Sequence, residues 1–192
     1  RPNIDLNVER VADKARKHAA LLERVQAAAK PGLVYVATRK HAEELAALLS
    51  EGGLRAAHYH AGLASSVRKQ TEAAFMADEY DVLVATTAFG MGIDKPNVRF
   101  VYHADISESL DAYYQEIGRA GRDGKPSRAI LMHSYADRYT HDYFLQRDYP
   151  DYFNKVKFYI GDVRDQQSLY DAMPGVDYIF HAAALKEVPS CE

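Results

Sequence analysis

The chain has 192 residues, of which 27% are charged, and a net charge of −3. This length suits one α/β domain of about 150 residues with a further piece. The single cysteine, Cys191, excludes a disulfide framework and a four-cysteine zinc site, and it suits a reducing cytoplasm. No apolar run approaches the roughly 20 residues of a membrane span, and no signal peptide opens the chain, so we expect no membrane partner. Acidic and basic residues balance over the first 150 positions, so any nucleic acid must be held by individually placed side chains.

The first third of the chain alternates between helical and strand patterns. Residues 12–29 predict an amphipathic helix, because apolar side chains recur three and four positions apart: Ala15, Ala19, Leu22 and Val25. Residues 33–37 form a short apolar run that is typical of a buried strand. A second amphipathic helix follows, with one apolar face: Ala42, Leu45, Ala46 and Leu49.

Thr38 and Arg39 stand between this strand and the second helix. A hydroxyl and a guanidinium at the carboxyl end of a strand, beside a helix amino terminus, can hold a phosphodiester. A helix cap followed by a solvated arginine is the ordinary alternative. These two residues alone do not decide between the interpretations.

The next strand, over residues 55–59, leads into the sequence HYHAGL. His58 and His60 are two positions apart, so on a strand they face the same side, which suggests a metal pair. We predict no metal site, because no carboxylate or further histidine accompanies them locally. A helix over residues 65–77 follows, with an inward face predicted from its spacing: Val67, Thr71, Ala74 and Phe75.

Residues 81–124 carry the most informative stretch. The run 82–85 is apolar and rich in valine, as expected for a strand that is covered on both faces of a parallel sheet. Thr86 follows, and then Gly90 and Gly92, which let the backbone approach a phosphate or ribose closely. Asp94 comes directly after this loop.

A further strand over residues 99–104 leads into a helix that begins near Ser107, with an apolar and aromatic face: Leu110, Tyr113, Tyr114 and Ile117. The helix ends at Arg119 and Arg122, which are one turn apart. Two permanent charges at this spacing can converge on one anionic group. The ordinary alternative is a basic helix end beside a glycine turn.

The sequences AFGMGIDKPNVRFV and YYQEIGRAGRDG resemble motifs five and six of superfamily-two helicases, and in particular those of the RecQ-like DNA helicases. The strand followed by Thr38-Arg39 resembles motif four. The resemblance implies that residues 1–150 are a second motor domain with the RecA-like α/β fold, a parallel sheet with helices on both faces. It also implies an arginine-finger role for Arg122, with Arg119 beside it.

The resemblance implies further roles for individual residues. Gly92 and Asp94 would lie near the nucleotide ribose, and Gln115 would link the nucleotide state to the grip on DNA. The residues expected near single-stranded or tailed DNA are Thr38, Arg39, His60 and Thr86.

The phosphate-binding GxxxxGK[ST] loop and the acidic Mg²⁺ motif belong to the first motor domain, and neither pattern occurs in these residues. We therefore expect ATP and Mg²⁺ to bind only together with a P-loop-bearing first domain. No cofactor and no ATP hydrolysis are expected for the chain alone.

Beyond motif six, residues 128–133 predict a strand and residues 135–148 a closing helix. Residues 151–192 then predict a βαβ Rossmann-like fragment. Two of its segments resemble extended short-chain dehydrogenases that act on UDP-sugars: KVKFYIGDVRD and GVDYIFHAAALKEVPSCE. By that resemblance the remnants of a cofactor site would be Asp162, Val163, Ala182, Ala183 and Ala184.

The fragment lacks both GxGxxG and a tyrosine-xxx-lysine pair, so we expect a chimera rather than a dehydrogenase. Two alternatives stay open. The first is a fragment of an NAD-dependent nucleotide-sugar enzyme, and the second is an engineered or chimeric α/β protein without activity. A change in melting temperature with DNA would favour the helicase domain and one with NADH the nucleotide-sugar enzyme, because a bound ligand stabilises the folded state. The protein without activity would respond to neither.

Overall fold

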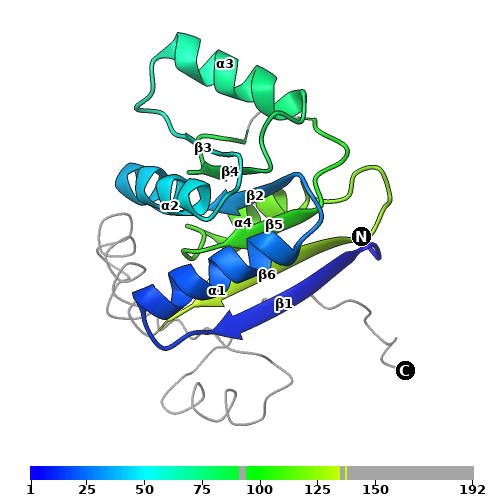
Figure 1. The fold of residues 1–192 in the computed structure, drawn as a ribbon. Coiled ribbons are helices and arrows are strands. Elements are labelled where there is room, and N and C mark those ends of the chain that lie inside the picture. Colours follow the sequence, from blue (N-terminus) through cyan, green and yellow to red (C-terminus); the bar gives the residue numbers. More distant parts are fainter. Residues whose placement is uncertain (91–93, 135–136, 138–192) are drawn as a thin grey trace, which may run out of the picture. The chain divides into compact units, whose positions relative to one another are not determined.

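The computed structural model describes residues 1–90, 94–134 and 137, all of which belong to the unit Arg1–Asp137 (Figure 1). Gly92, the predicted helix over 135–148 and the predicted domain boundary after residue 150 lie outside the described residues. The same holds for the βαβ fragment and its predicted cofactor remnants, Asp162, Val163, Ala182, Ala183 and Ala184.

Six parallel strands form one sheet in the order β1-β6-β5-β2-β4-β3. The strands are β1 (Ile4–Arg10), β2 (Gly32–Tyr35), β3 (Ala56–Tyr59), β4 (Val82–Ala85), β5 (Phe100–His103) and β6 (Ser127–His133). In the central register, Leu33 of β2 lies opposite Leu83 of β4 and Val101 of β5. The predicted α/β class with a parallel sheet is confirmed.

Helices cover both faces of the sheet, as predicted. They are α1 (Lys14–Ala27), α2 (Arg39–Glu51), α3 (Ser65–Met76) and α4 (Leu110–Ile117). Leu21 of α1 and Leu45 of α2 belong to the hydrophobic core on one face, where the two helices lie side by side (Figure 1). The core on the other face contains Phe75 of α3, Ile117 of α4 and Phe89 from the loop after β4.

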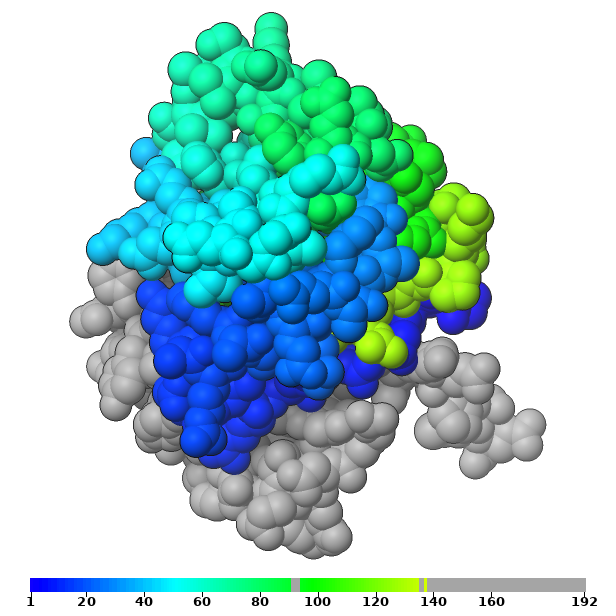
Figure 2. Space-filling model, viewed as in Figure 1, coloured from blue at the N-terminus to red at the C-terminus, as the bar shows by residue number. Residues whose placement is uncertain are grey.

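The side chains of α1 and α2 form a continuous surface in the space-filling view (Figure 2). Both helices begin with a side-chain cap. The Asp13 carboxylate accepts a hydrogen bond from the Arg16 amide at 2.8 Å, and the Thr38 hydroxyl accepts one from the His41 amide at 3.2 Å. Such caps satisfy amide groups that have no partner within the helix, so they fix where each helix starts.

The buried face of α1 differs from the predicted one. Of the predicted face, Val25 is buried and Leu22 half-buried, but Ala15 and Ala19 are exposed. Leu21 and Lys17 are buried in addition. The Lys17 ammonium donates to the Ala104 carbonyl at 2.8 Å and to the Asp137 carboxylate at 2.6 Å. Because these partners satisfy its charge, Lys17 can lie on the buried face of α1, next to Leu21.

Three further features differ from the sequence-based expectations. No strand was predicted before residue 12, but Ile4–Arg10 forms the edge strand β1, paired in parallel with β6. Val67 was expected to face inward and is 43% exposed, because α3 covers the sheet through Thr71 and Phe75. The helix predicted to begin near Ser107 begins at Leu110, with Ser109 as its cap.

Candidate nucleic-acid and nucleotide interface

The four predicted nucleic-acid-binding residues lie along one edge of the sheet. Thr38 and Arg39 follow β2, His60 follows β3, and Thr86 follows β4. Since β2, β4 and β3 are neighbours and parallel, their carboxyl ends meet at this edge. The loops at the carboxyl ends of parallel strands are where α/β folds bind their ligands.

Exposure differs among these residues. Thr38 and Arg39 are exposed, while Thr86 is buried and its amide donates to the Tyr59 carbonyl at 3.1 Å. A Cβ placed on Gly62 would lie 3.0 Å from Arg39 Nη1, so the guanidinium rests over this glycine. Arg39 is thus the accessible cation of the edge, and Thr86 mainly ties β3 to β4.

His60 is 4% exposed, and its Nε2 lies 3.0 Å from Oε1 of Glu43 on α2. Its ring stacks on His58, with 5.5 Å between the ring centroids. The expectation that no carboxylate accompanies these histidines therefore fails in three dimensions. Helix α2 connects β2 to β3 across the sheet, and this crossover brings Glu43 beside residues 15 to 17 positions further on.

Asp105, directly after β5, holds the start of α2 in place. Its carboxylate accepts hydrogen bonds from the Ala37 amide at 2.8 Å and from His41 Nδ1 at 2.7 Å. Burial opposes ionisation of Asp105, but the His41 hydrogen bond and charge and the Ala37 amide together hold its pKa below the ordinary value. Burial and the neighbouring His41 lower the pKa of His18, whose Nε2 lies 3.2 Å from His41 Nε2.

Replacing Asp105 by asparagine should lower the free energy of unfolding by about 1.5 to 3 kcal/mol at neutral pH, the usual value of a hydrogen bond to a charged group. A carboxyl whose pKa is lowered by folding stabilises the protein above its unfolded-state pKa of about 3.9, and this stabilisation disappears as pH falls through the folded-state pKa. The difference in the free energy of unfolding between wild type and Asp105→Asn should therefore be smaller at about pH 3 than at about pH 7, as measured by urea unfolding.

Glu23→Gln, on the exposed side of α1, is the matched control and should leave unfolding unchanged at both pH values. A difference for Asp105→Asn that stays constant across this range would contradict the assignment of the stabilisation to the ionised carboxylate.

Arg119 and Arg122 both contact the loop after β4, but each has its own partner. Arg119 Nη2 donates to the Gly90 carbonyl. Arg122 Nη1 lies 2.6 Å from Asp94 Oδ1, with 82% of the Asp94 side chain exposed. The two arginines thus have separate partners in the structure, and their convergence on one anionic group stays a prediction.

Tyr35 joins this arrangement from β2. Its hydroxyl donates to the Phe89 carbonyl at 3.0 Å, and burial raises its pKa far above the ordinary value, so it remains a donor. Arg119 lies next to this hydroxyl and is half-buried. Arg119 therefore positions the loop, while Arg122 remains the more accessible of the two arginines.

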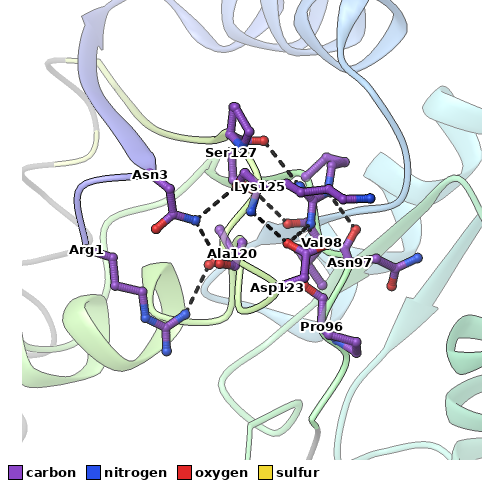
Figure 3. Close-up of polar contacts among 12 residues, drawn as sticks. Arg1, Asn3, Pro96, Asn97, Val98, Ala120, Asp123, Lys125 and Ser127 are labelled. Carbon is purple, nitrogen blue, oxygen red and sulfur yellow. Dashed lines mark hydrogen bonds and ion pairs between the residues drawn. The ribbon is translucent and has the colours of Figure 1, made fainter.

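The segment that carries the arginines is held from the amino terminus of the chain (Figure 3). The Asn3 side-chain amide donates to the Gly121 carbonyl at 2.7 Å and to the Lys125 carbonyl at 2.9 Å. Arg1 Nη1 donates to the Ala120 carbonyl at 3.2 Å. Sequence patterns did not indicate Asn3, because its partners lie more than a hundred positions away.

A second set of contacts holds this segment from the start of β5. Arg99 Nη2 lies 2.6 Å from Asp123 Oδ1, and the Asp123 amide donates to the Pro96 carbonyl at 3.1 Å (Figure 3). Together with Asn3, these contacts fix the backbone on both sides of Arg122. A guanidinium on a fixed backbone can be aimed at a ligand without a large loss of conformational entropy.

Gln115 lies on the exposed side of α4, and the next residue, Glu116, is buried beneath it. Glu116 Oε2 accepts hydrogen bonds from Ser107 at 2.7 Å and from His103 Nε2 at 2.8 Å. A small cavity of about 20 Å³ lies beside this network, which is room for about one water molecule. The network anchors α4, and thereby Gln115, to the end of β5.

None of the described helices combines the length and the apolarity that a membrane span requires.

A six-stranded parallel sheet, polar residues after three neighbouring strands and two arginines after α4 are the features expected of a RecA-like helicase domain. The chain belongs to the helicase conserved C-terminal domain family, whose model matches residues 14–124. Within that family it resembles the second RecA-like domain of RecQ-like helicases, as the sequence predicted.

Two curated relatives come from Bacillus subtilis. The probable ATP-dependent DNA helicase RecS is 44% identical over 149 residues, which are 77% of this chain and 30% of RecS. The ATP-dependent DNA helicase RecQ is 48% identical over 116 residues, which are 60% of this chain and 20% of RecQ. The chain therefore spans less than a third of the length of these relatives.

Solved structures share the fold. The E. coli DEAD-box protein SrmB, bound to RraA, matches with a TM-score of 0.65 and 28% identity over 75% of this chain and 87% of that chain. Dbp5 of S. cerevisiae, bound to RNA and ADP BeF3, matches with a TM-score of 0.65 and 24% identity over 81% of this chain and 40% of that chain.

A second family model, described as polysaccharide biosynthesis protein, matches residues 125–192. Its matched range includes β6, which pairs with β1 on one side and β5 on the other. Residues Ser127–His133 are therefore part of the helicase sheet, whatever the origin of the residues that follow.

Proposed function

We propose that this chain is the second motor domain of an ATP-dependent RecQ-like DNA helicase. It binds the DNA backbone at the carboxyl edge of β2, β4 and β3 and contributes Arg122 to a nucleotide site that a first motor domain completes. The separation of these two surfaces carries the proposal, since the accessible Arg39 lies on that edge while Arg122 lies in the segment after α4. ATP and Mg²⁺ then bind only when a P-loop-bearing first domain is present.

The nucleotide surface consists of two parts that already contact each other. Arg122 supplies a permanent positive charge that offsets the negative charge developing on the γ-phosphate, and Asp94 offers an exposed carboxylate for ribose hydroxyls. By the resemblance, Gly92 would also lie near the ribose, and Gln115 on α4 would transmit the nucleotide state to the DNA surface. Arg119 acts through its contact with Gly90 and is a positioning residue.

The DNA surface acts through phosphate contacts. Arg39 is exposed and beside His60, and Thr38 presents a hydroxyl at the start of α2. With a balanced overall charge, the domain has no broad positive field, so these few contacts supply the affinity. We expect weak binding of single-stranded or tailed DNA that added salt reduces.

Replacing Arg39 by alanine should weaken binding of single-stranded DNA about fivefold, which corresponds to ~1 kcal/mol for one charged hydrogen bond at an exposed site. The slope of log K against log salt concentration should fall by about 0.7, the value for one phosphate contact on a single strand. Fluorescence anisotropy with a labelled oligonucleotide over a salt series measures both quantities.

Arg128→Ala is the matched control, because Arg128 lies at the opposite, amino edge of the sheet near the start of β6. It removes one positive charge and should leave the salt slope unchanged. Equal effects of the two substitutions would show that bulk charge, rather than a placed contact, holds the DNA, and the proposed edge would then be wrong.

The match of residues 125–192 to a polysaccharide biosynthesis family supports a second proposal, that a fragment of a nucleotide-sugar enzyme is joined to the helicase domain. Its cofactor contacts would be remnants at Asp162, Val163, Ala182, Ala183 and Ala184. Under this proposal NADH leaves the melting temperature unchanged while DNA raises it slightly. A rise with NADH would instead favour a working dinucleotide site.

A further inference from the structure

Three side chains with metal-binding atoms meet beside the carboxyl end of β3. They are Glu43 from α2, His58 within β3 and His60 directly after it, and one ligand atom from each lies within 4.8 Å of the other two. The closest pair is His60 Nε2 and Glu43 Oε1, at 3.0 Å. We propose that these residues form a binding site for a divalent transition-metal ion of the Zn²⁺ class.

The spacing suits a tetrahedral ion. Ligand atoms at about 2.0 to 2.2 Å from Zn²⁺ are separated from one another by about 3.3 Å in a tetrahedron, so the His60–Glu43 pair already has nearly the required distance. The remaining distances must shorten by up to about 1.5 Å, within the reach of a rotating exposed glutamate side chain. Glu43 is exposed, and its side chain is free to make this adjustment.

His58 must turn to join the ion. Its ring is nearly parallel to that of His60, with an angle of 11° between the ring planes, so the nitrogen lone pairs of the two rings do not yet meet. His58 is only half-buried, and rotation about its Cβ–Cγ bond is a soft torsion. A small rearrangement of one ring and one carboxylate therefore completes the site.

The imidazole ring of His60 has a hydrogen-bond partner on one side only. The side chain is buried, yet its Nδ1 has no hydrogen-bond partner in the part of the chain that the structure describes. Buried polar atoms usually have one, because leaving them unpaired costs about 1 to 3 kcal/mol. Because Nδ1 has no partner, it can carry the proton while Nε2, which faces Glu43, binds the ion.

The ligand set selects the class of ion. Two imidazoles and one carboxylate suit Zn²⁺, whereas Ca²⁺ and Mg²⁺ prefer a full set of oxygen ligands. Three protein ligands leave the fourth tetrahedral position for water or an anion. A Cβ on Gly62 would lie 3.0 Å from Arg39 Nη1 and 3.1 Å from His60 Nδ1, so the site is next to the cation of the edge. Binding of the ion itself does not depend on the proposed helicase function.

Titration of the full chain with Zn²⁺ by isothermal calorimetry tests the site. We expect one Zn²⁺ per chain at this site, with Mg²⁺ giving no binding heat. Glu43→Gln and His58→Gln should each weaken Zn²⁺ binding at least about tenfold, as loss of groups around a bound metal does. Co²⁺ should give the visible absorption of a tetrahedral complex, and this absorption should disappear in His58→Gln.

Glu44→Gln is the matched control, because Glu44 is the next residue on α2 and pairs with Lys14 at 3.4 Å instead of with the histidines. It should bind Zn²⁺ as wild type does. Circular dichroism checks that every variant is folded. The proposal is overturned if wild type binds no Zn²⁺, or if Glu43→Gln and His58→Gln bind as tightly as Glu44→Gln, since the ion would then occupy other residues.

Discussion

Replacing Arg122 by alanine should lower DNA-stimulated ATP turnover by about 10³-fold in a protein that joins this chain to a P-loop-bearing first motor domain. The guanidinium is proposed to meet charge that develops only in the transition state, so its loss should reduce kcat much more than ATP affinity. Contacts with Asn3 and Arg99 fix the backbone on both sides of Arg122. We therefore expect a loss of activity as large as that seen when a well-positioned arginine finger is removed.

The contact between Arg122 and Asp94 does not prevent this role. Asp94 is 82% exposed, and ion pairs of this kind are worth about 0 to 1 kcal/mol because water and salt screen them. A γ-phosphate, with its greater charge, can therefore draw the guanidinium away from Asp94. In the proposed role, the pair would keep the arginine close to Asp94 until nucleotide binds.

Steady-state kinetics of three variants distinguishes a finger from a general effect of charge. Arg122→Lys keeps the charge but loses the planar fork, so it should recover only part of the activity. Arg128→Ala removes a cation whose side chain pairs with Asp5 at 3.3 Å instead of with Asp94, and it should retain wild-type turnover. Wild-type kcat in Arg122→Ala would sink the finger assignment, whereas a large rise in KM alone would indicate ground-state binding.

Local patterns predicted the parts of the fold that are determined by neighbouring residues. The apolar runs that became β2 and β4 are buried on both faces, and such strands need no distant information to be recognised. The polar residues that follow them, Thr38 and Thr86, had to come together once the strands were parallel neighbours. The grouping on one edge therefore follows from the sequence, although the burial of Thr86 does not.

Features that depend on distant partners were not predictable in this way. Strand β1 is an edge strand whose Val8 is 42% exposed, so it lacks the continuous apolar run of the central strands. The predicted buried face of α1 was partly wrong because the spacing of its alanines is compatible with several faces. The larger Leu21 determines which face is buried. Lys17 is buried because Ala104 and Asp137 happen to receive its ammonium.

The candidate sites show the same division. The spacing of His58 and His60 was recognised in the sequence. Glu43 comes close to them only because α2 crosses from β2 to β3. The motif that contains Arg119 and Arg122 was recognised in the sequence. The hydrogen bonds from Asn3 to this segment were not predicted. Sequence reasoning thus found groups within one segment, and the structure added the residues that other segments contribute.

Replacing Gly121 by alanine should lower the free energy of unfolding by about 3 kcal/mol and the melting temperature by about 10 °C. Its φ of +56° is a left-handed conformation that costs an L-residue about 1 kcal/mol. An added Cβ would overlap the Asn3 side-chain amide and lie 2.7 Å from Ser127 Oγ and 2.9 Å from the Lys125 carbonyl. Crowding of this kind costs about 1 to 3 kcal/mol more.

Gly124→Ala separates the two contributions, because Gly124 has a φ of +79° and a Cβ there would meet nothing within 4 Å. It should cost only the conformational part, about 1 kcal/mol, when both variants are unfolded thermally under the same conditions. The excess loss in Gly121→Ala then measures how tightly Asn3 and Lys125 enclose the segment between Arg119 and Arg122. Equal losses would mean that this segment yields to the added methyl group, and the rigid backing inferred for Arg122 would be absent.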